Sequence, residues 1–138
     1  MSILLADDRP EVRRALTILL EQQPRLTVVG EAVDAHDLLI QVETTCPDML
    51  LLDWELPGMA AIELLSALRG INPDLLVIAL SGRPGTRRAA LAAGADAFVS
   101  KADPPDRLLA AIRRGGSGSS DGEARSSLRA GVLADSPS

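Results

Sequence analysis

The chain has 138 residues, a formal net charge of −5 and only two aromatic side chains, Trp54 and Phe98. This length suits one domain with an aliphatic core, and the mild acidity argues against unaided binding to a nucleic acid or an anionic membrane. Cys46, the single cysteine, cannot form an internal disulfide, and His36, the single histidine, cannot anchor a His/Cys metal cluster.

The N-terminal apolar run at residues 3–6 is the first predicted strand, and it ends at Asp7 and Asp8. It is too short to be a signal peptide or a membrane span. We therefore expect a cytoplasmic location and no membrane contact.

Four more apolar runs follow, and the segments between them have apolar residues at helical spacing. The runs predict strands at residues 3–6, 26–31, 48–53, 75–80 and 97–100. The intervening segments predict helices near residues 12–20, 35–42, 61–68, 86–93 and 108–112. Because the strands are continuously apolar rather than alternating, we expect a parallel sheet that is covered on both faces.

Signals at the helix ends agree with this assignment. Pro10 lies just inside the first helix, Asp34 precedes the second, and Asp103 with Pro104 opens the last. The fourth helix is short and alanine-rich and ends at Gly94.

Alternation of strands and helices predicts a three-layer α/β domain with right-handed crossovers. We expect a doubly wound, five-stranded parallel sheet with the flavodoxin-like strand order 2-1-3-4-5. This domain would span residues 1–114. Residues 115–138 begin with a Gly/Ser-rich stretch typical of flexible linkers and are predicted to form a disordered tail.

Polar side chains follow four of the predicted strands at their carboxyl ends. They are Asp7 and Asp8 after the first strand, Asp53 at the end of the third, Ser81 after the fourth and Lys101 after the fifth. In the expected strand order these four ends are neighbours, and open parallel sheets bind ligands at that edge. Each residue alone is explained by a helix cap, a turn or a solvated surface, but the joint pattern predicts one site.

Three carboxylates at one edge repel each other and need a compensating charge. An all-oxygen donor set suits Mg²⁺ or Mn²⁺ rather than Zn²⁺. Lys101 and Ser81 would supply a point charge and a hydrogen-bond donor for a phosphoryl group. The set predicts phosphoryl transfer, with Asp53 best placed to form an aspartyl phosphate.

At this point the sequence resembles the receiver domain of two-component response regulators. The resemblance covers about residues 2–114 and rests on the five polar residues at their spacing and on the stretch 50–59. The segments 6–13 and 94–101 are most similar to receivers joined to a LuxR-type helix-turn-helix output domain.

The resemblance implies a role for each site residue. Asp53 would accept a phosphoryl group from the phosphohistidine of a sensor histidine kinase or phosphotransfer protein. Asp8 and Asp53 would ligate Mg²⁺ (or Mn²⁺) directly, Asp7 through water, and Glu55 through its backbone carbonyl. Lys101 would pair with the phosphoryl oxygens.

The resemblance also implies a two-state switch rather than a dedicated enzyme, with self-catalysed phosphotransfer and autodephosphorylation. Ser81 would move to the phosphoryl group, and the rotamer of Phe98 would follow it. The signal would pass to the surface of the fourth helix, fifth strand and fifth helix. A homodimer is also possible. The simpler explanation for Phe98 is that it is a core residue.

This chain departs from the common family pattern at several positions. Ala60 and Ala61 stand where many members have Asp-Gly, and Ala102 stands where many have a cis proline. Glu55 and Arg83 occupy positions that tune hydrolysis of the aspartyl phosphate in the family, and they could pair across the site.

Two other functions remain open at this stage. One is a receiver-like interaction module that works without phosphate. The other is a phosphatase of the haloacid dehalogenase type, which needs an Asp two positions after the nucleophile, where Glu55 stands. Residues 115–138 are too few for a helix-turn-helix domain, so we expect no specific DNA binding. The sequence names neither the kinase nor the output partner, and it does not decide between a stand-alone receiver and a fragment of a longer regulator.

Overall fold

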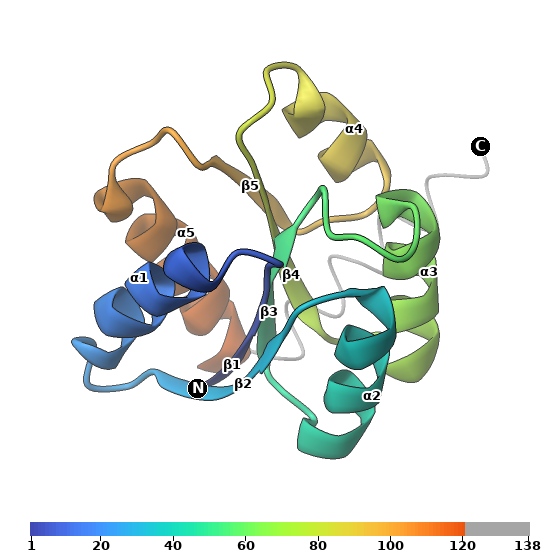
Figure 1. Cartoon of the computed structure of the whole chain (residues 1–138). Coiled ribbons are helices and arrows are strands. Elements are labelled where there is room, and N and C mark those ends of the chain that lie inside the picture. The colour runs from blue at the N-terminus through green and yellow to red at the C-terminus, as the bar shows by residue number, and fades with distance from the viewer. Residues whose placement is uncertain (121–138) are drawn as a thin grey trace, which may run out of the picture.

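Parallel strands form the centre of the computed structural model, which describes residues 1–120 (Figure 1). The strands are β1 (Ser2–Ala6), β2 (Thr27–Ala32), β3 (Met49–Asp53), β4 (Leu76–Ser81) and β5 (Ala97–Ser100). All neighbouring pairs are parallel, and the order β2-β1-β3-β4-β5 confirms the predicted doubly wound topology. The predicted strand positions are correct to within one residue at each end.

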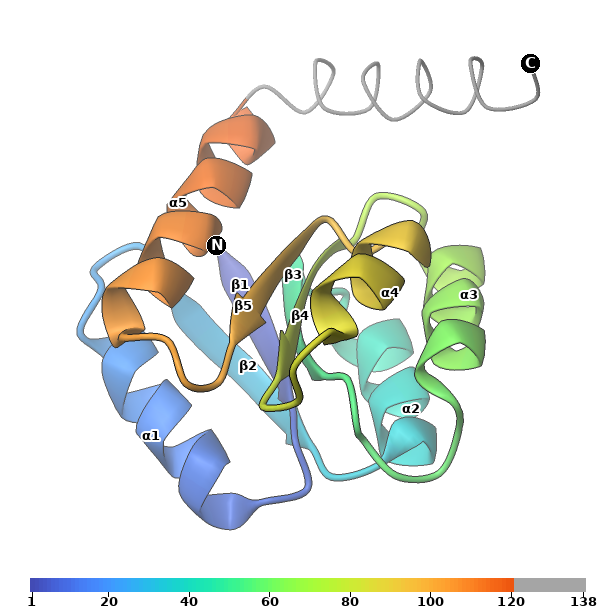
Figure 2. The same ribbon diagram turned by 90° about the horizontal axis from the view of Figure 1, so that it is seen from above.

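Helices cover both faces of this sheet. They are α1 (Pro10–Glu21), α2 (Ala35–Thr45), α3 (Ala61–Ile71), α4 (Thr86–Ala92) and α5 (Pro105–Ser120). Figures 1 and 2 show α1 and α5 on one face and α2, α3 and α4 on the other. The three-layer α/β/α architecture is therefore as predicted, and none of the helices within residues 1–120 is long and apolar enough to cross a membrane.

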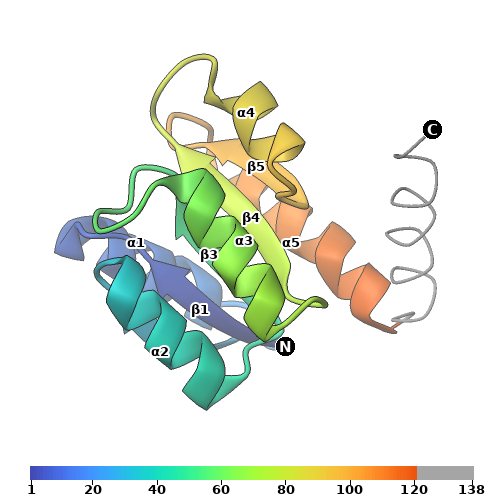
Figure 3. The same ribbon diagram turned by 90° about the vertical axis from the view of Figure 1, so that its right-hand side faces the viewer.

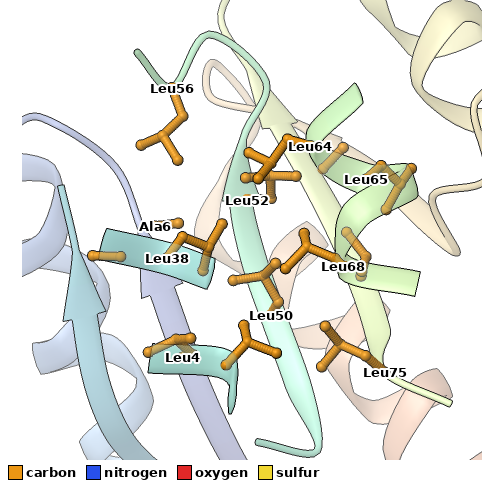
Figure 4. Packing of buried hydrophobic residues seen from close by; sticks show 14 of the residues in the cluster. Leu4, Ala6, Leu38, Leu50, Leu52, Leu56, Leu64, Leu65, Leu68 and Leu75 are labelled. Carbon is orange, nitrogen blue, oxygen red and sulfur yellow. The ribbon is translucent and has the colours of Figure 1, made fainter. Parts of the chain in front are cut away.

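The continuous apolar runs of the strands are explained by two hydrophobic clusters, one on each face of the sheet. Leu50 and Leu52 of β3 pack between Leu38 of α2 and Leu68 of α3 (Figure 4). Leu51, which points to the opposite face, belongs to the second cluster with residues of α1 and α5. Since successive residues of a strand point to opposite faces, a run of leucines fills both layers.

The helix starts follow the signals in the sequence. Pro10 is the first residue of α1, where its missing N–H costs nothing. Asp34 caps α2, because its side chain accepts a hydrogen bond from the Asp37 N–H at 2.8 Å. The last helix begins at Pro105, one residue later than the predicted Pro104.

Helix α5 runs past residue 114, the predicted end of the domain. Helix α5 continues through residues 115–120, which had the composition of a linker, and extends away from the rest of the fold (Figure 3). A Cβ at Gly115 would lie 2.7 Å from Met49 Cε and 3.3 Å from Leu76 Cδ1, so glycine lets the helix approach the sheet closely. Tertiary packing thus overrides the low helix propensity of glycine at this position. Residues 121–138 of the predicted tail lie outside the described part of the chain.

Candidate functional site

The strand register brings the predicted site residues to one edge of the sheet. Ala6 lies opposite Leu52, so the following residues, Asp7 and Asp53, are neighbours. On the other side, Ser81 is opposite Ser100, and the Ser81 carbonyl accepts a hydrogen bond from the Lys101 N–H at 2.9 Å. The juxtaposition that the sequence predicted is therefore present.

Three carboxylates converge at this edge. Asp7, Asp8 and Asp53 each place a carboxylate oxygen within 4.8 Å of the others. Asp7 and Asp53 are buried, with 1% and 3% of their surface exposed, whereas Asp8 is exposed. A cavity of about 360 Å³ opens onto the group, and its walls are Asp8, Arg9, Asp53, Glu55, Gly82, Arg83 and Lys101.

Lys101 compensates part of this negative charge. Its Nζ lies 2.8 Å from Asp7 Oδ2 and 3.3 Å from Asp53 Oδ1. Burial by itself lowers the pKa of the Lys101 ammonium, but the hydrogen bond to Asp7 and the charges of Asp53 and Asp7 outweigh burial and raise the pKa above its ordinary value. Lys101 is therefore charged at neutral pH and is shared between the two buried carboxylates.

The two oxygens of Asp53 have different surroundings. Oδ1 accepts a hydrogen bond from the Glu55 N–H at 3.0 Å and is the oxygen near Lys101, whereas Oδ2 accepts no hydrogen bond from residues 1–120. Burial raises the pKa of Asp53, and the charge of Asp7 adds to this increase; the Glu55 N–H and Lys101 offset it only in part. Asp53 thus has one oxygen held in place and one available for chemistry.

The other two carboxylates also differ in their hydrogen bonding. Asp7 uses both oxygens, because Oδ1 accepts from the Arg9 N–H at 2.9 Å and Oδ2 from Lys101. The Asp8 side chain accepts no hydrogen bond from the part of the chain that the structure describes. Unbonded carboxylate oxygens on Asp8 and Asp53, with Asp7 beside them, are the hard oxygen donors that Mg²⁺ or Mn²⁺ takes, so these residues fit such an ion.

Ser81 faces this group from β4, but its hydroxyl is engaged elsewhere. Ser81 Oγ lies 3.0 and 2.9 Å from the two carboxylate oxygens of Glu55 and 3.3 Å from Thr86 Oγ1. It also accepts a hydrogen bond from the Arg83 N–H at 3.0 Å. The ion pair expected between Glu55 and Arg83 does not form among the described residues, because the Glu55 carboxylate binds Ser81 instead.

The two aromatic side chains pack against the hydrophobic core near the site residues in the sequence. Trp54 directly follows Asp53, and its backbone N–H donates a hydrogen bond to the Leu80 carbonyl at 2.8 Å. Phe98 lies on β5 opposite Ala79. Both rings are half-buried against the hydrophobic cluster under α2 and α3, a position compatible with the core explanation for Phe98 as well as with a switch.

Sequence reasoning overlooked two residues of the site, Arg9 and Thr86. Arg9 lines the cavity and holds Asp7 through its backbone N–H. Thr86, at the start of α4, donates a hydrogen bond to the Arg83 carbonyl at 3.0 Å and contacts Ser81. The position of Arg9 directly after the acidic pair could have indicated that it lies at the site. For Thr86, the indication was the short spacing between Ser81 and the start of the next helix.

Comparisons with known proteins agree with this geometry. A family model described as the response regulator receiver domain matches residues 3–113. The nitrate/nitrite response regulator NarP of Escherichia coli is 34% identical over 119 residues, which cover 85% of this chain and 55% of the relative. The transcriptional activator ExaE of Pseudomonas putida is 38% identical over 116 residues, which cover 83% of this chain and 54% of the relative. The chain thus spans about half the length of these curated relatives.

Solved structures show the same fold. A LuxR-family two-component response regulator from Aurantimonas sp. SI85-9A1 superposes with a TM-score of 0.76 at 33% identity, covering 82% of each chain. The isolated receiver domain of RcsB from Salmonella enterica serovar Typhimurium, solved in the presence of the phosphomimetic BeF₃⁻, gives 0.75 at 28% identity, covering 83% of this chain and 89% of that one.

Proposed function

The chain belongs to the response regulator receiver domain family of two-component systems, and we propose that it is switched by phosphorylation of Asp53. The observation that carries this proposal is the Asp53 carboxylate itself. It is buried, fixed through Oδ1 by the Glu55 N–H, and free at Oδ2 beside a cavity that the solvent reaches. A carboxylate oriented in this way can act as a nucleophile.

In the proposed reaction, Asp53 Oδ2 attacks the phosphorus of a phosphohistidine on a sensor histidine kinase or phosphotransfer protein. The new O–P bond forms as the N–P bond to the histidine breaks, and the leaving imidazole keeps the electron pair. The residues that would hold Mg²⁺ are Asp7, Asp8, Asp53 and the backbone carbonyl of Glu55. The contribution of the ion when bound is positive charge, which offsets repulsion between the carboxylates and the incoming phosphoryl group.

Lys101 and Ser81 would stabilise the product. The Lys101 ammonium already lies near Asp53 Oδ1, so it needs only a small displacement from Asp7 to pair with a phosphoryl oxygen. The Ser81 hydroxyl would supply a second donor after leaving Glu55. Movement of Ser81 would free space for Phe98 and alter the surface of α4, β5 and α5, through which the domain would contact its output partner or a second copy.

The alternative functions have weaker support. An interaction module that works without phosphate has no need for buried acidic groups and a lysine around an open cavity. A haloacid dehalogenase mechanism needs a general acid two positions after the nucleophile. Glu55 stands there, but its carboxylate accepts the Ser81 hydroxyl.

Phosphorylation by acetyl phosphate with Mg²⁺, followed by intact mass spectrometry, tests this proposal. We expect the wild type and the control Asp106→Asn, which changes an exposed aspartate on α5, to gain one phosphoryl group. Asp53→Asn should gain none, because the amide is not nucleophilic. Trp54, the neighbour of Asp53, should report the same difference through its fluorescence when BeF₃⁻ and Mg²⁺ are added. Equal phosphoryl gain in Asp53→Asn and the wild type would contradict the proposal.

A further inference from the structure

The hydroxyl of Ser81 donates its hydrogen bond to Glu55 and not to Asp53. A serine hydroxyl has one proton to donate. Both oxygens of Glu55 lie within 3.0 Å of Ser81 Oγ, and a carboxylate is a stronger acceptor than the Thr86 hydroxyl at 3.3 Å. The lone pairs of Oγ face the Arg83 N–H at 3.0 Å. The only proton that Ser81 could offer to a phosphoryl group therefore goes to Glu55.

Glu55 borders both the acidic cavity and a second hollow. Glu55 and Arg83 line both the acidic cavity and an adjoining hollow of about 410 Å³. The remaining walls of this hollow are mostly apolar and come from Trp54, Leu56, Met59, Ala60, Ala61 and Ile62. Glu55 is half-buried and borders two open spaces, which leave its side chain room to move.

Arg83 offers Glu55 a second partner. It is exposed, and its guanidinium forms no hydrogen bond or ion pair with the residues that the structure describes. Because Glu55 and Arg83 line the same two spaces, the carboxylate can exchange the Ser81 hydroxyl for the guanidinium without a change in the strands.

We propose that Glu55 is a positioning residue that holds the Ser81 hydroxyl away from Asp53 until phosphorylation drives Glu55 toward Arg83. This inference rests on the proposed phosphorylation of Asp53. A phosphoryl group brings the local charge to about −2, and the Glu55 carboxylate shares its cavity, so repulsion favours departure of Glu55. The phosphoryl oxygens then accept a hydrogen bond from the released Ser81 hydroxyl. The Ser81–Glu55 contact keeps the unphosphorylated domain inactive.

A double-mutant cycle between Glu55 and Ser81 tests this role, with the rate of phosphorylation by acetyl phosphate in Mg²⁺ as the readout. We expect Glu55→Ala to accelerate the reaction about tenfold in the wild-type background, roughly the worth of one hydrogen bond to a charged group. In the Ser81→Ala background, Glu55→Ala should change nothing, since no hydroxyl remains to be released. Glu55→Gln keeps an acceptor oxygen and should accelerate less than Glu55→Ala. Glu63→Ala, which removes the same charge from an exposed position on α3, is the matched control.

The cycle separates the two proposals. An equal acceleration by Glu55→Ala in both backgrounds would mean that Glu55 merely repels the phosphoryl donor, and it would overturn the positioning role while phosphorylation stands. No phosphoryl gain in the wild type would overturn the proposed function instead.

A second readout needs neither Mg²⁺ nor a phosphodonor. The Arg83 amide proton donates to Ser81 Oγ, so its NMR chemical shift depends on the orientation of that hydroxyl. We expect the shift to change in Glu55→Ala and to stay constant in Glu63→Ala. An unchanged Arg83 resonance in Glu55→Ala would show that Glu55 does not hold Ser81.

Discussion

Aspartates lie at both edges of the β-sheet, but their hydrogen bonding differs. At the amino edge, Asp48 Oδ2 accepts the Ser2 N–H at 2.8 Å and the Ser2 hydroxyl at 3.1 Å. Asp96 Oδ2, just before β5, accepts the Val77 N–H at 2.8 Å and pairs with Arg69 at 2.9 Å. At the carboxyl edge, Asp8 and one oxygen of Asp53 accept no hydrogen bond from the described residues.

This difference separates structural aspartates from Asp8 and Asp53, which keep unbonded oxygens, whereas Asp7 at the same edge is hydrogen-bonded through both of its oxygens. An amino-edge carboxylate satisfies backbone N–H groups where a strand begins, and the fold gains stability from it. A buried carboxylate with an unbonded oxygen costs stability, because its desolvation is incompletely compensated. The fold tolerates that cost at the edge where the cavity lies. Substitutions at the two edges should therefore have opposite consequences for stability and phosphorylation.

The largest effect on stability is expected at the amino edge. Asp96→Ala removes the ion pair to Arg69 and leaves the N–H of Val77, which is fully buried, without its side-chain partner. We expect the free energy of unfolding to fall by about 3 kcal/mol, measured by urea denaturation. Phosphorylation of the remaining folded protein by acetyl phosphate should be unchanged.

Asp96→Asn sharpens this comparison, because the amide oxygen can still accept from Val77 while the charge is lost. It should destabilise the fold less than Asp96→Ala does. If Asp96→Ala left stability intact but abolished phosphorylation, the division between the two edges would be wrong.

Topology explains why so much of the site was predictable. The continuous apolar runs fixed a parallel sheet, and the strand order then required Asp7, Asp53, Ser81 and Lys101 to converge. That inference needed only strand positions, which were correct to within one residue.

Side-chain partners could not be predicted in the same way. Glu55 shares its cavity with Arg83 but binds Ser81, and this choice depends on local geometry that residue spacing does not encode. Gly115 was also misleading, because it begins a Gly/Ser-rich stretch whose composition is typical of a linker. In the structure, its lack of a side chain instead allows α5 to approach Met49 and Leu76. In both cases the outcome depends on contacts between segments far apart in the sequence.

A somewhat smaller effect should distinguish the carboxyl edge when Mg²⁺ is added. An ion that binds only the folded state stabilises it by about 2.7 kcal/mol at a concentration one hundred times its dissociation constant. We expect this gain in the wild type, measured as a shift of the urea midpoint, and a much smaller gain in Asp8→Asn. Asp96→Asn, the same substitution at the opposite edge, should retain the full gain. Equal Mg²⁺ stabilisation of Asp8→Asn and the wild type would remove Asp8 from the ligand set.

The smallest effect is expected from pH, because burial and Lys101 act on Asp53 in opposite directions. Burial raises the pKa of Asp53 above its ordinary value of 3.8, so the folded domain keeps this proton to a higher pH than the unfolded chain does. Where the folded state binds more protons, stability decreases as pH rises. With a chelator present, the stability of Asp53→Asn relative to the wild type should therefore increase as pH rises from about 4 and level off once Asp53 is ionised in both states. Urea denaturation of both proteins at several pH values measures this difference in the free energy of unfolding. The contributions of the other carboxylates largely cancel, because both proteins contain them. A relative stability that decreases with pH would mean that the Lys101 ion pair outweighs burial and that Asp53 stabilises the fold as the amino-edge aspartates do.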